Sequence, residues 1–380
     1  MKQFSTSRRR EITVGVDLGK KSSHVFAVSP KGELLADRKI VTSAQTFREF
    51  FSRWEHAEVV IEVGPTALWV HALLEELGHT VLVVNPRQMP EIYKTKKKTD
   101  RIDATKLARA AWRGRDDLPL VQLRTMDQQA DLAVVRTRGM LVKLRTKMIN
   151  HVRSVCSSFG VSLPACDGHY FHRKVKDEIP EELAPVLLPV LQEIENLSVQ
   201  ITAFDKKIEA LCERYPETRN LRGVPGVGAL TALAFVLTLH DHRRFKRSRT
   251  VASYLGLVPI VDQSAGRDPQ LRISKCGDPY MRQLLVTAAH YILGAYGADS
   301  DLRRHGQRIC PEGSKNRGAK KRSVIAVARK LAVVLHHLWA KDQQYEPFPN
   351  GLPPEAPAPR SVRSRAKMVV KRLLPQQLPS

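Results

Sequence analysis

Two aspartates three residues apart follow a run of lysines in the stretch KTKKKTDRIDATKLA, residues 94–108. On a helix, Asp100 and Asp103 would point to one face, about one turn apart. Two further acids stand in apolar surroundings, since Asp17 ends the strand-like run ITVGVDL and Glu62 lies inside VVIEVG. A buried carboxylate needs a partner or a metal ion. The four acids therefore predict a metal site.

Carboxylate oxygens are hard ligands, which suit Mg²⁺ or Mn²⁺ better than zinc. Two such ions can activate a nucleophile and stabilise a leaving oxygen on phosphate. Each acid also has a commoner explanation: Asp17 could cap a turn, Glu62 could pair with a lysine, and Asp100 could favour a helix dipole behind Thr99 as N-cap. The strand–strand–helix combination makes those separate explanations much less attractive than one metal site.

The net charge of +24 over 380 residues makes nucleic acid the expected partner. Beside the metal site, Lys94, Lys96, Lys97 and Lys98 would neutralise phosphates, and Arg101 could add a bidentate contact. The alternative is a solvated charge run. Five scattered cysteines argue against a zinc module or a disulfide framework. With no signal peptide and no run of roughly 20 apolar residues, we expect a cytoplasmic protein without a membrane segment.

The pattern of apolar residues predicts a mixed α/β region followed by helices. Three strands are expected within residues 11–41, then a helix over 43–55, a strand over 57–65, a helix over 66–78, a strand over 79–86 and a helix ending near 112. We therefore place an α/β domain at 1–125, a helical coiled-coil region at 126–215, a C-terminal helical domain at 216–345 and a basic disordered tail at 346–380.

Long helices are expected over residues 127–157 and 181–213 in the middle region. In the second, apolar residues recur at intervals of three and four, at Ile194, Leu197, Ile201, Phe204, Ile208 and Leu211. Such a seam packs either against the first helix, in an antiparallel hairpin, or against a second copy of the chain. The sequence leaves both possibilities open.

The C-terminal region holds a short polar loop, QSAGRD, in which Ser264 is flanked by Arg267, Arg272 and Lys275. A serine that attacks phosphate needs help to lose its proton and cations near the developing charge. A loop serine more commonly makes a turn hydrogen bond, and Ser274 in RISKCG is a competing nucleophile.

A glycine-rich turn, GVPGVG, precedes an apolar helix and looks like a helix-hairpin-helix. There Gly226 and Gly228 could let backbone N–H groups approach a phosphate. A plain turn between packed helices is about as good an explanation. Arg282, on the next helix, would extend the basic surface.

Several of these stretches together resemble one family. GVDLGKKSSHVFAV, IEVGP, VVNP and KTKKKTDRIDATKLA resemble the RuvC-like (RNase H-like) domain of the DEDD transposases of the IS110 family of bacterial insertion sequences, including its IS1111 branch. GVPGVGALTA, ASYLGLVP, QSAGRDPQLRISKCGDPYMRQLL and ARKLAVVLHHLW resemble that family's second transposase domain. The resemblance covers roughly residues 12–340.

The resemblance implies that Asp17, Glu62, Asp100 and Asp103 form the D, E, D, D of the motif. It also implies a serine recombinase in which a structured bridge RNA pairs with donor and target double-stranded DNA, and Ser264 forms a covalent link to DNA. Protomers would associate as dimers and tetramers, with each active site completed by two protomers. Family members often carry two glycines after this serine, whereas this chain has Ala265 and Gly266.

Three other classes of function remain possible from the sequence. A metal-dependent RuvC-like nuclease of the junction-resolvase type would leave Ser264 inert. A sugar kinase or actin-like ATPase would explain VGVDLGKKSSHVFAV as a phosphate loop, but the DxxD pair and the positive charge speak against it. A non-catalytic nucleic-acid-binding protein would tolerate the loss of Asp17 or Glu62.

Overall fold

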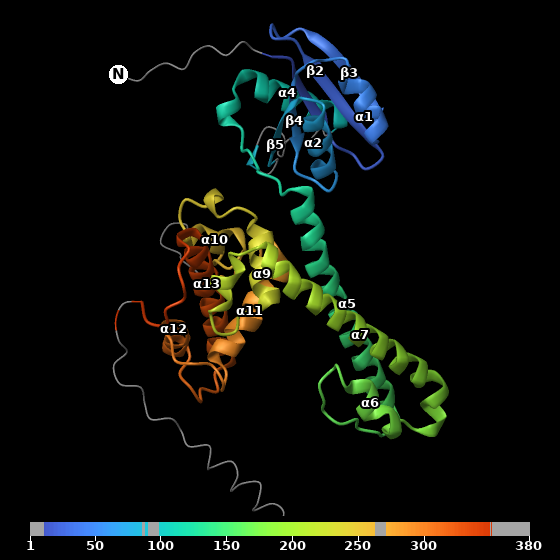
Figure 1. Ribbon diagram of the computed structural model, residues 1–380, viewed down its shortest axis with the longest axis vertical. Coiled ribbons are helices and arrows are strands. Elements are labelled where there is room, and N and C mark those ends of the chain that lie inside the picture. Colours follow the sequence, from blue (N-terminus) through green and yellow to red (C-terminus); the bar gives the residue numbers. More distant parts are fainter. Residues whose placement is uncertain (1–10, 86–87, 90–98, 263–270, 350, 352–380) are drawn as a thin grey trace, which may run out of the picture. The chain divides into compact units, whose positions relative to one another are not determined.

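The computed structural model of the chain describes residues 11–85, 88–89, 99–262, 271–349 and 351. The chain divides into two compact units, residues 1–133 and 134–380 (Figure 1). The expected boundary at 125/126 coincides with the start of the long helix α5, Met126–Ser158, whose first turns belong to the first unit.

A five-stranded sheet forms the centre of the N-terminal unit. Its strands are β1 (Thr13–Asp17), β2 (Ser22–Val28), β3 (Leu34–Val41), β4 (Glu58–Glu62) and β5 (Thr80–Val84), in the order β3-β2-β1-β4-β5. Short turns join β1, β2 and β3, which are therefore antiparallel, whereas β1, β4 and β5 are parallel and are joined through helices.

Helices cover both faces of this sheet (Figure 1). Helices α1 (Ala44–Phe51) and α2 (Ala67–Glu76) pack on one face, against side chains that include Val14, Val16 and Ile61. Helix α4 (Asp100–Arg113) packs on the other face, against Phe26 and Val60 among others. Since side chains alternate along a strand, each strand contributes to both cores.

Gly15 is the position where α4 comes closest to the sheet. A Cβ atom on Gly15 would overlap the carbonyl oxygen of Ala104 and the amide nitrogen of Ala108. The helix backbone therefore lies directly on β1, and only glycine allows this approach. The small side chains of Ala104 and Ala108, both fully buried, serve the same close packing.

Helices α5 and α7 (Ala184–Arg214) form an antiparallel hairpin in the second unit (Figure 1). Arg138 of α5 pairs with Asp205 of α7 at 2.8 Å, and Arg145 donates to the Ser198 hydroxyl at 3.1 Å. These pairs step in opposite directions along the two helices. Along α7, the buried positions recur every seven residues, at Leu187, Ile194, Ile201 and Ile208. The hairpin alternative for the apolar seam is therefore what the structure contains.

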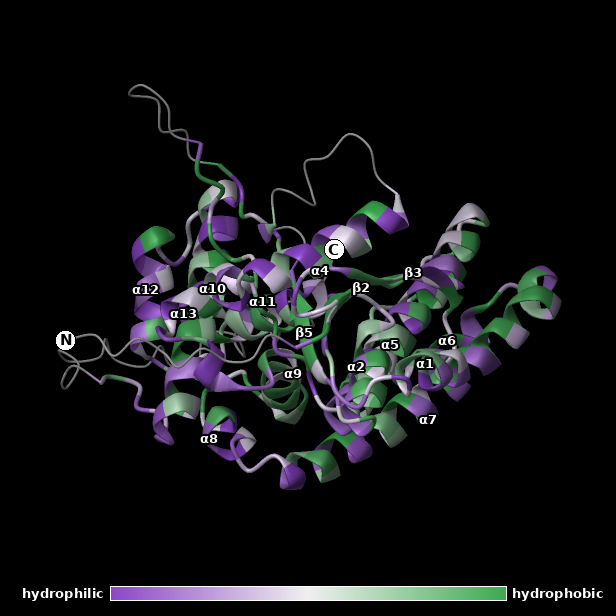
Figure 2. Cartoon of the chain, turned by 90° about the horizontal axis from the view of Figure 1, so that it is seen from above, coloured by the Kyte–Doolittle hydropathy of each residue, from purple (hydrophilic) through white to green (hydrophobic). Residues whose placement is uncertain are grey.

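The rest of the second unit is helical. Its further helices are α6 (Phe171–Val175), α8 (Thr218–Arg222), α9 (Ala229–Leu239), α10 (Arg249–Tyr254), α11 (Pro279–Leu293), α12 (Asp301–Ile309) and α13 (Arg317–Lys341). Helix α9 is almost wholly buried and apolar (Figure 2). Helix α13 is long and apolar enough to cross a membrane by length and composition alone, yet half of its apolar window is buried in this unit, where it packs with α11 and α12.

The predicted elements all appear in the described residues, with ends that differ by a few residues: the strands are shorter, whereas α5 extends one residue beyond the expected 127–157 at each end. The helix expected over 43–55 is α1, and the strand expected over 57–65 is the five-residue β4, which ends at Glu62 itself. Short 3₁₀ helices, which sequence patterns do not reveal, lie at Arg115–Asp117, Lys176–Glu178, Glu181–Leu183 and His242–Arg244. The basic tail expected from residue 346 lies almost entirely outside the described residues.

A buried histidine connects α13 to the segment before α10. The ring of His336, 2% exposed, has Nε2 3.0 Å from the carbonyl oxygen of His242 and Nδ1 3.0 Å from the hydroxyl of Ser248. A carbonyl only accepts, so Nε2 carries the proton and Nδ1 accepts from Ser248. Burial lowers the pKa of His336 and outweighs the hydrogen bond to the His242 carbonyl, which raises it.

Acid should therefore destabilise the C-terminal unit through His336. The unfolded chain binds a proton there near the ordinary pKa of 6.5, whereas the folded chain binds it only at lower pH. The contribution to stability is thus complete above that value and is lost as the pH falls, by at most about 1.4 kcal/mol per pH unit. Urea unfolding of the full chain between neutral and mildly acidic pH gives the free energy of unfolding at each pH. This free energy should fall less steeply with decreasing pH in His336→Gln than in the wild type. The control is His337→Gln, which changes the exposed neighbouring histidine. A pH dependence that is unchanged in His336→Gln but altered in His337→Gln would contradict this assignment.

Gly15→Ala should destabilise the N-terminal unit by about 3 kcal/mol, because its methyl group forces α4 away from β1. Gly64→Ala is the matched control, since nothing lies within 4 Å of a Cβ built there, and it should change stability by no more than about 0.5 kcal/mol. Thermal unfolding of both variants measures the difference. Equal stability of the two would show that the close approach is not a constraint.

Candidate active site

Three elements bring the four predicted acids to the same edge of the sheet. Asp17 and Glu62 end the neighbouring parallel strands β1 and β4. Asp17 is two residues after Gly15, and Glu62 is two residues after Val60. Residues two apart in a strand point to the same face, so both acids project toward the face that α4 covers. Helix α4 begins at Asp100 and crosses β1 at Ala104, which places its first turn beside these strand ends.

The first turn of α4 is shaped by its cap. Thr99 accepts a hydrogen bond from the amide of Ile102 at 3.3 Å, as expected for an N-cap. Asp100 is exposed, whereas Asp103 is half-buried. The Oδ1 atom of Asp103 is buried, with no hydrogen-bond partner among the described residues. A buried carboxylate oxygen without a partner is costly, so this atom fits a cation ligand.

The acids share a face and an edge, but their side chains do not converge. Within the described ranges, which contain all four acids, no three His, Cys, Asp or Glu side chains come close enough to hold one metal ion. Asp17 and Glu62 each have an interaction with another group. The donor type and the unpaired Asp103 oxygen therefore fit a divalent cation, while the present rotamers do not form its coordination sphere.

A polar network that the sequence analysis missed lies on the same face. His24 of β2 pairs with Asp17 in the strand register, and its Nε2 is 2.7 Å from Oδ1 of Asp37 on β3. Arg101 donates through Nε to Oδ2 of Asp37 at 2.7 Å. The hydrogen bond from His24, and then the contacts with Arg101, lower the pKa of Asp37 below its ordinary value. The only signal in the sequence is that His24 and Asp37 are ionisable residues within strand-like segments.

The same network bears on one predicted phosphate contact. Two nitrogens of Arg101, Nε and Nη2, are engaged by Asp37. This edge of the guanidinium is one of the two that could bind a phosphate in a bidentate way. In this arrangement Arg101 fixes α4 to β3, and its contact with nucleic acid stays a prediction.

Several predicted residues fall outside the described ranges. They are Lys94, Lys96, Lys97, Lys98, Ser264 and Arg267. The competing serine, Ser274, is described: it is half-buried, and its amide donates to the carbonyl of Val258 at 2.9 Å. The role of either serine therefore stays a prediction.

The residues after that gap pair with an earlier segment. The backbone amide of Ile260 donates to the carbonyl of Arg272 at 2.9 Å, and the amide of Lys275 donates to the carbonyl of Gly256 at 3.1 Å. Residues 256–260 and 272–275 therefore run antiparallel. The side chains of Arg272 and Lys275 are both exposed. They are thus available to solvent, as their predicted role in nucleic-acid binding requires.

The glycine-rich turn does join two helices, α8 and α9. Gly226 has a φ of +84°, and a Cβ there would lie 3.0 Å from the carbonyl oxygen of Ala288 and from the ring of Tyr291, both on α11. Gly228 is the N-cap of α9, and a Cβ there would meet nothing within 4 Å. Gly226 is therefore required for turn geometry and packing, whereas Gly228 is the one with open space beside its backbone.

Arg282 has a structural role that the sequence analysis did not anticipate. Its Nη1 atom donates to three backbone carbonyls, those of Leu255, Cys276 and Gly277. Nearby, Asp278 caps α11 by accepting from the amides of Tyr280 and Met281, and its second oxygen accepts from Arg136 at 2.8 Å. Arg282 thus binds the loop before α11 to the end of α10.

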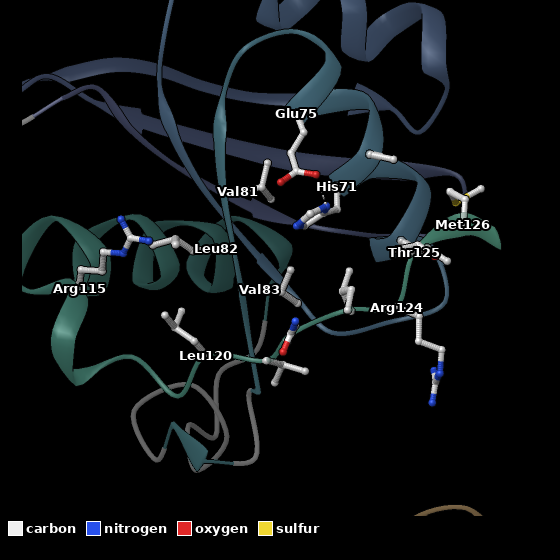
Figure 3. A pocket seen from close by; sticks show the side chains of 15 residues that line it. His71, Glu75, Val81, Leu82, Val83, Arg115, Leu120, Arg124, Thr125 and Met126 are labelled. Atoms are coloured by element: carbon white, nitrogen blue, oxygen red, sulfur yellow. Dashed lines mark ion pairs between the residues drawn. The ribbon is translucent and has the colours of Figure 1, made fainter. Parts of the chain in front are cut away.

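The N-terminal unit also has a pocket of about 620 Å³ (Figure 3). It lies between α2, β5 and residues 120–126, and none of the four acids lines it. His71 and Glu75 form an ion pair at 3.1 Å on its wall. This pocket is separate from the acidic edge of the sheet and contributes no residue to the candidate active site.

Arg282→Met should destabilise the C-terminal unit by about 2–3 kcal/mol without nucleic acid present, because it leaves carbonyl oxygens without their donor. Arg282→Lys should recover part of this loss. Exposed Arg272→Met, the matched control for loss of charge, should change stability by no more than about 0.5 kcal/mol. Denaturant unfolding of the three variants measures the effect, and equal stability of the two Met variants would contradict a structural role for Arg282.

Comparison with known proteins matches both parts of the chain. Residues 14–159 match a family model for DEDD transposases of the IS110 type, described as "Transposase", and residues 218–302 match the model "Transposase IS116/IS110/IS902 family". The "Probable family 20 transposase" of Pseudomonas aeruginosa is 28% identical over 341 residues, 88% of this chain and 98% of that protein.

Two further relatives extend this agreement. The "Transposase for insertion sequence element IS1111A" of Coxiella burnetii is 26% identical over 87% of this chain and 90% of its own. The "Transposase for insertion sequence element IS1328" of Yersinia enterocolitica is 29% identical over 73% of this chain and 82% of its own. The two family models lie in order on the α/β unit and the helical unit, and the chain therefore belongs to the IS110 family of transposases.

Proposed function

We propose that the protein is a DNA recombinase that moves an insertion sequence by cutting and rejoining donor and target double-stranded DNA. One observation carries the proposal: β1, β4 and the first turn of α4 bring Asp17, Glu62, Asp100 and Asp103 to one edge and one face of the sheet. The strand order and the mixture of antiparallel and parallel pairs support an RNase H-like (RuvC-like) domain.

In this proposal the four acids hold Mg²⁺ or Mn²⁺. The buried oxygen of Asp103 that lacks a hydrogen-bond partner among the described residues is the best-supported ligand. A divalent ion would activate a hydroxyl and offset charge on a transferring phosphate. The network of His24, Asp37 and Arg101 holds α4 on the sheet, and thereby holds the carboxylates of its first turn at the strand ends.

Ser264 is the proposed nucleophile. Its hydroxyl oxygen would bond to a DNA phosphorus while the bond from that phosphorus to one DNA oxygen breaks; the serine would give its proton to a base, and the departing DNA oxygen would take up a proton and leave as a hydroxyl. A DNA hydroxyl from the partner strand later displaces the serine. Arg272 and Lys275, exposed on the same segment of chain, would offset phosphate charge.

A structured bridge RNA is proposed as the guide that pairs with donor and target DNA. The net charge of +24 supports polyanion binding but does not distinguish RNA from DNA. We further propose dimers that associate as tetramers on DNA. Because the α7 seam already packs against α5 within one chain, association would need other surfaces, such as the exposed Met140, Leu144 and Val199 of the hairpin.

The first experiment incubates the purified full chain with Mg²⁺, labelled donor and target DNA, and RNA transcribed from the flanks of the element. A covalent protein–DNA adduct on a denaturing gel is expected from the wild type and should be absent from Ser264→Ala, because only the hydroxyl can form the linkage. Ser274→Ala is the matched control and should retain the adduct.

Asp103→Asn should reduce adduct formation by at least about a hundredfold, because it removes a charged ligand from the proposed metal site. Cleavage without any adduct in all of these proteins would instead indicate a metal-dependent nuclease of the junction-resolvase type. An adduct that persists in Ser264→Ala and disappears in Ser274→Ala would move the nucleophile to Ser274.

A further inference from the structure

Lys275 has a backbone conformation that lysine rarely adopts. Its φ is +55°, in the left-handed region. Among the described residues other than glycine, only His240 and Asp342 share a positive φ. Those two are the C-caps of α9 and α13, where this conformation is usual, and His and Asp enter it more readily than most residues. Lys275 lies within a loop, so neither explanation applies.

The surrounding chain imposes this conformation. Gly256 and Gly277 also have positive φ, at +68° and +72°. A Cβ on Gly256 would overlap backbone atoms of Cys276, and one on Gly277 would overlap the carbonyl oxygen of Tyr254. The two loops are therefore in backbone contact directly after Lys275, at Cys276 and Gly277, which leaves this part of the loop little room to move.

Hydrogen bonds from neighbouring segments also hold the loop that contains Lys275. The Lys275 amide donates to Gly256 at 3.1 Å, and Arg282 donates to Cys276 and to Gly277 on the C-terminal side. Asp278 then caps α11 and accepts from Arg136. The backbone from which the Lys275 side chain projects is thus held in place by the protein before any ligand binds.

Glycine or asparagine would satisfy this backbone at lower cost, since a Cβ-bearing residue such as lysine pays about 1–2 kcal/mol in the left-handed region. The lysine side chain makes no contact that would stabilise the fold in compensation. It is exposed, and within residues 11–85, 99–262 and 271–349 no acceptor pairs with its ammonium group. A costly residue without an internal contact points to a role outside the fold.

We propose that the Lys275 ammonium, carried on a loop whose backbone is preorganised, contacts a phosphate and positions the DNA backbone on the C-terminal unit. The inference rests on the proposed function only in taking duplex DNA as the partner. An ammonium group is a compact charge that suits a phosphate oxygen, and a fixed loop lowers the entropy lost on binding. It acts as a positioning residue, and Arg272, three residues earlier in the chain, is a second exposed cation of this segment.

The test separates backbone strain from charge. Lys275→Asn fits the left-handed backbone but lacks the charge, so its unfolding equilibrium constant should fall about fivefold or more. At the same time its affinity for a labelled mixed-sequence DNA duplex should fall about five- to tenfold, and the slope of log affinity against log salt should decrease in magnitude by about one. Lys275→Arg keeps both charge and strain and should bind nearly as the wild type does.

Lys206→Gln is the control for the loss of one exposed charge elsewhere in the unit, and it should leave the salt slope within error of wild type. If Lys275→Asn fails to fold, Lys275→Gly takes its place. Wild-type affinity and slope in the uncharged variant would overturn the proposal, as would a loss of affinity confined to structured RNA. A wild-type protein that does not bind the duplex would overturn the proposed function as well.

Discussion

The contact between α4 and β1 at Gly15 determines the geometry of the N-terminal unit. Because no side chain separates the two backbones, the helix can cross the strand in only a narrow range of positions. Its first turn, with Asp100 and Asp103, is thereby fixed beside the ends of β1 and β4. Arg101 and Asp37 then set the helix against β3. The acids are thus placed by packing and need not attract one another, which four carboxylates would not do.

Glycines also allow close approach of neighbouring segments in the C-terminal unit. Gly256 and Gly277 let two loops meet backbone to backbone, and Gly139 lets α5 approach the ring of Tyr280 on α11. Such contacts leave carbonyl groups that must be satisfied, and Arg282 supplies the donor for three of them. Asp100 and Asp103 in one unit, and Lys275 in the other, are therefore carried on backbone segments whose positions are fixed by glycine contacts and internal hydrogen bonds, as a preorganised site requires.

Local patterns in the sequence were enough to place most elements and to find the acids. The alternation in ITVGVDL and the spacing of apolar residues in α7 are local properties, and the structure contains the corresponding strand and helix. The partner of the α7 seam was not predictable, because a hairpin and a dimer bury the same residues; contacts such as Arg138–Asp205 distinguish them. The roles of Arg282 and Lys275 depend on contacts between residues 254–256 and 275–282, which no local pattern encodes.

The distribution of cations changes what the net charge means. Arg101 is engaged by Asp37, Arg282 by backbone carbonyls, and Arg136 by Asp278, so these charges hold the fold together. Only side chains that remain free to contact phosphates, and so to release the counterions of the nucleic acid, contribute to the salt dependence of binding. The net charge of +24 is the difference between 62 Lys and Arg and 38 Asp and Glu residues, so it does not give the number of phosphate contacts. The exposed ammonium of Lys275 makes no contact in the described fold. In the proposed role it therefore contributes more to DNA binding than one charge out of the net total would suggest.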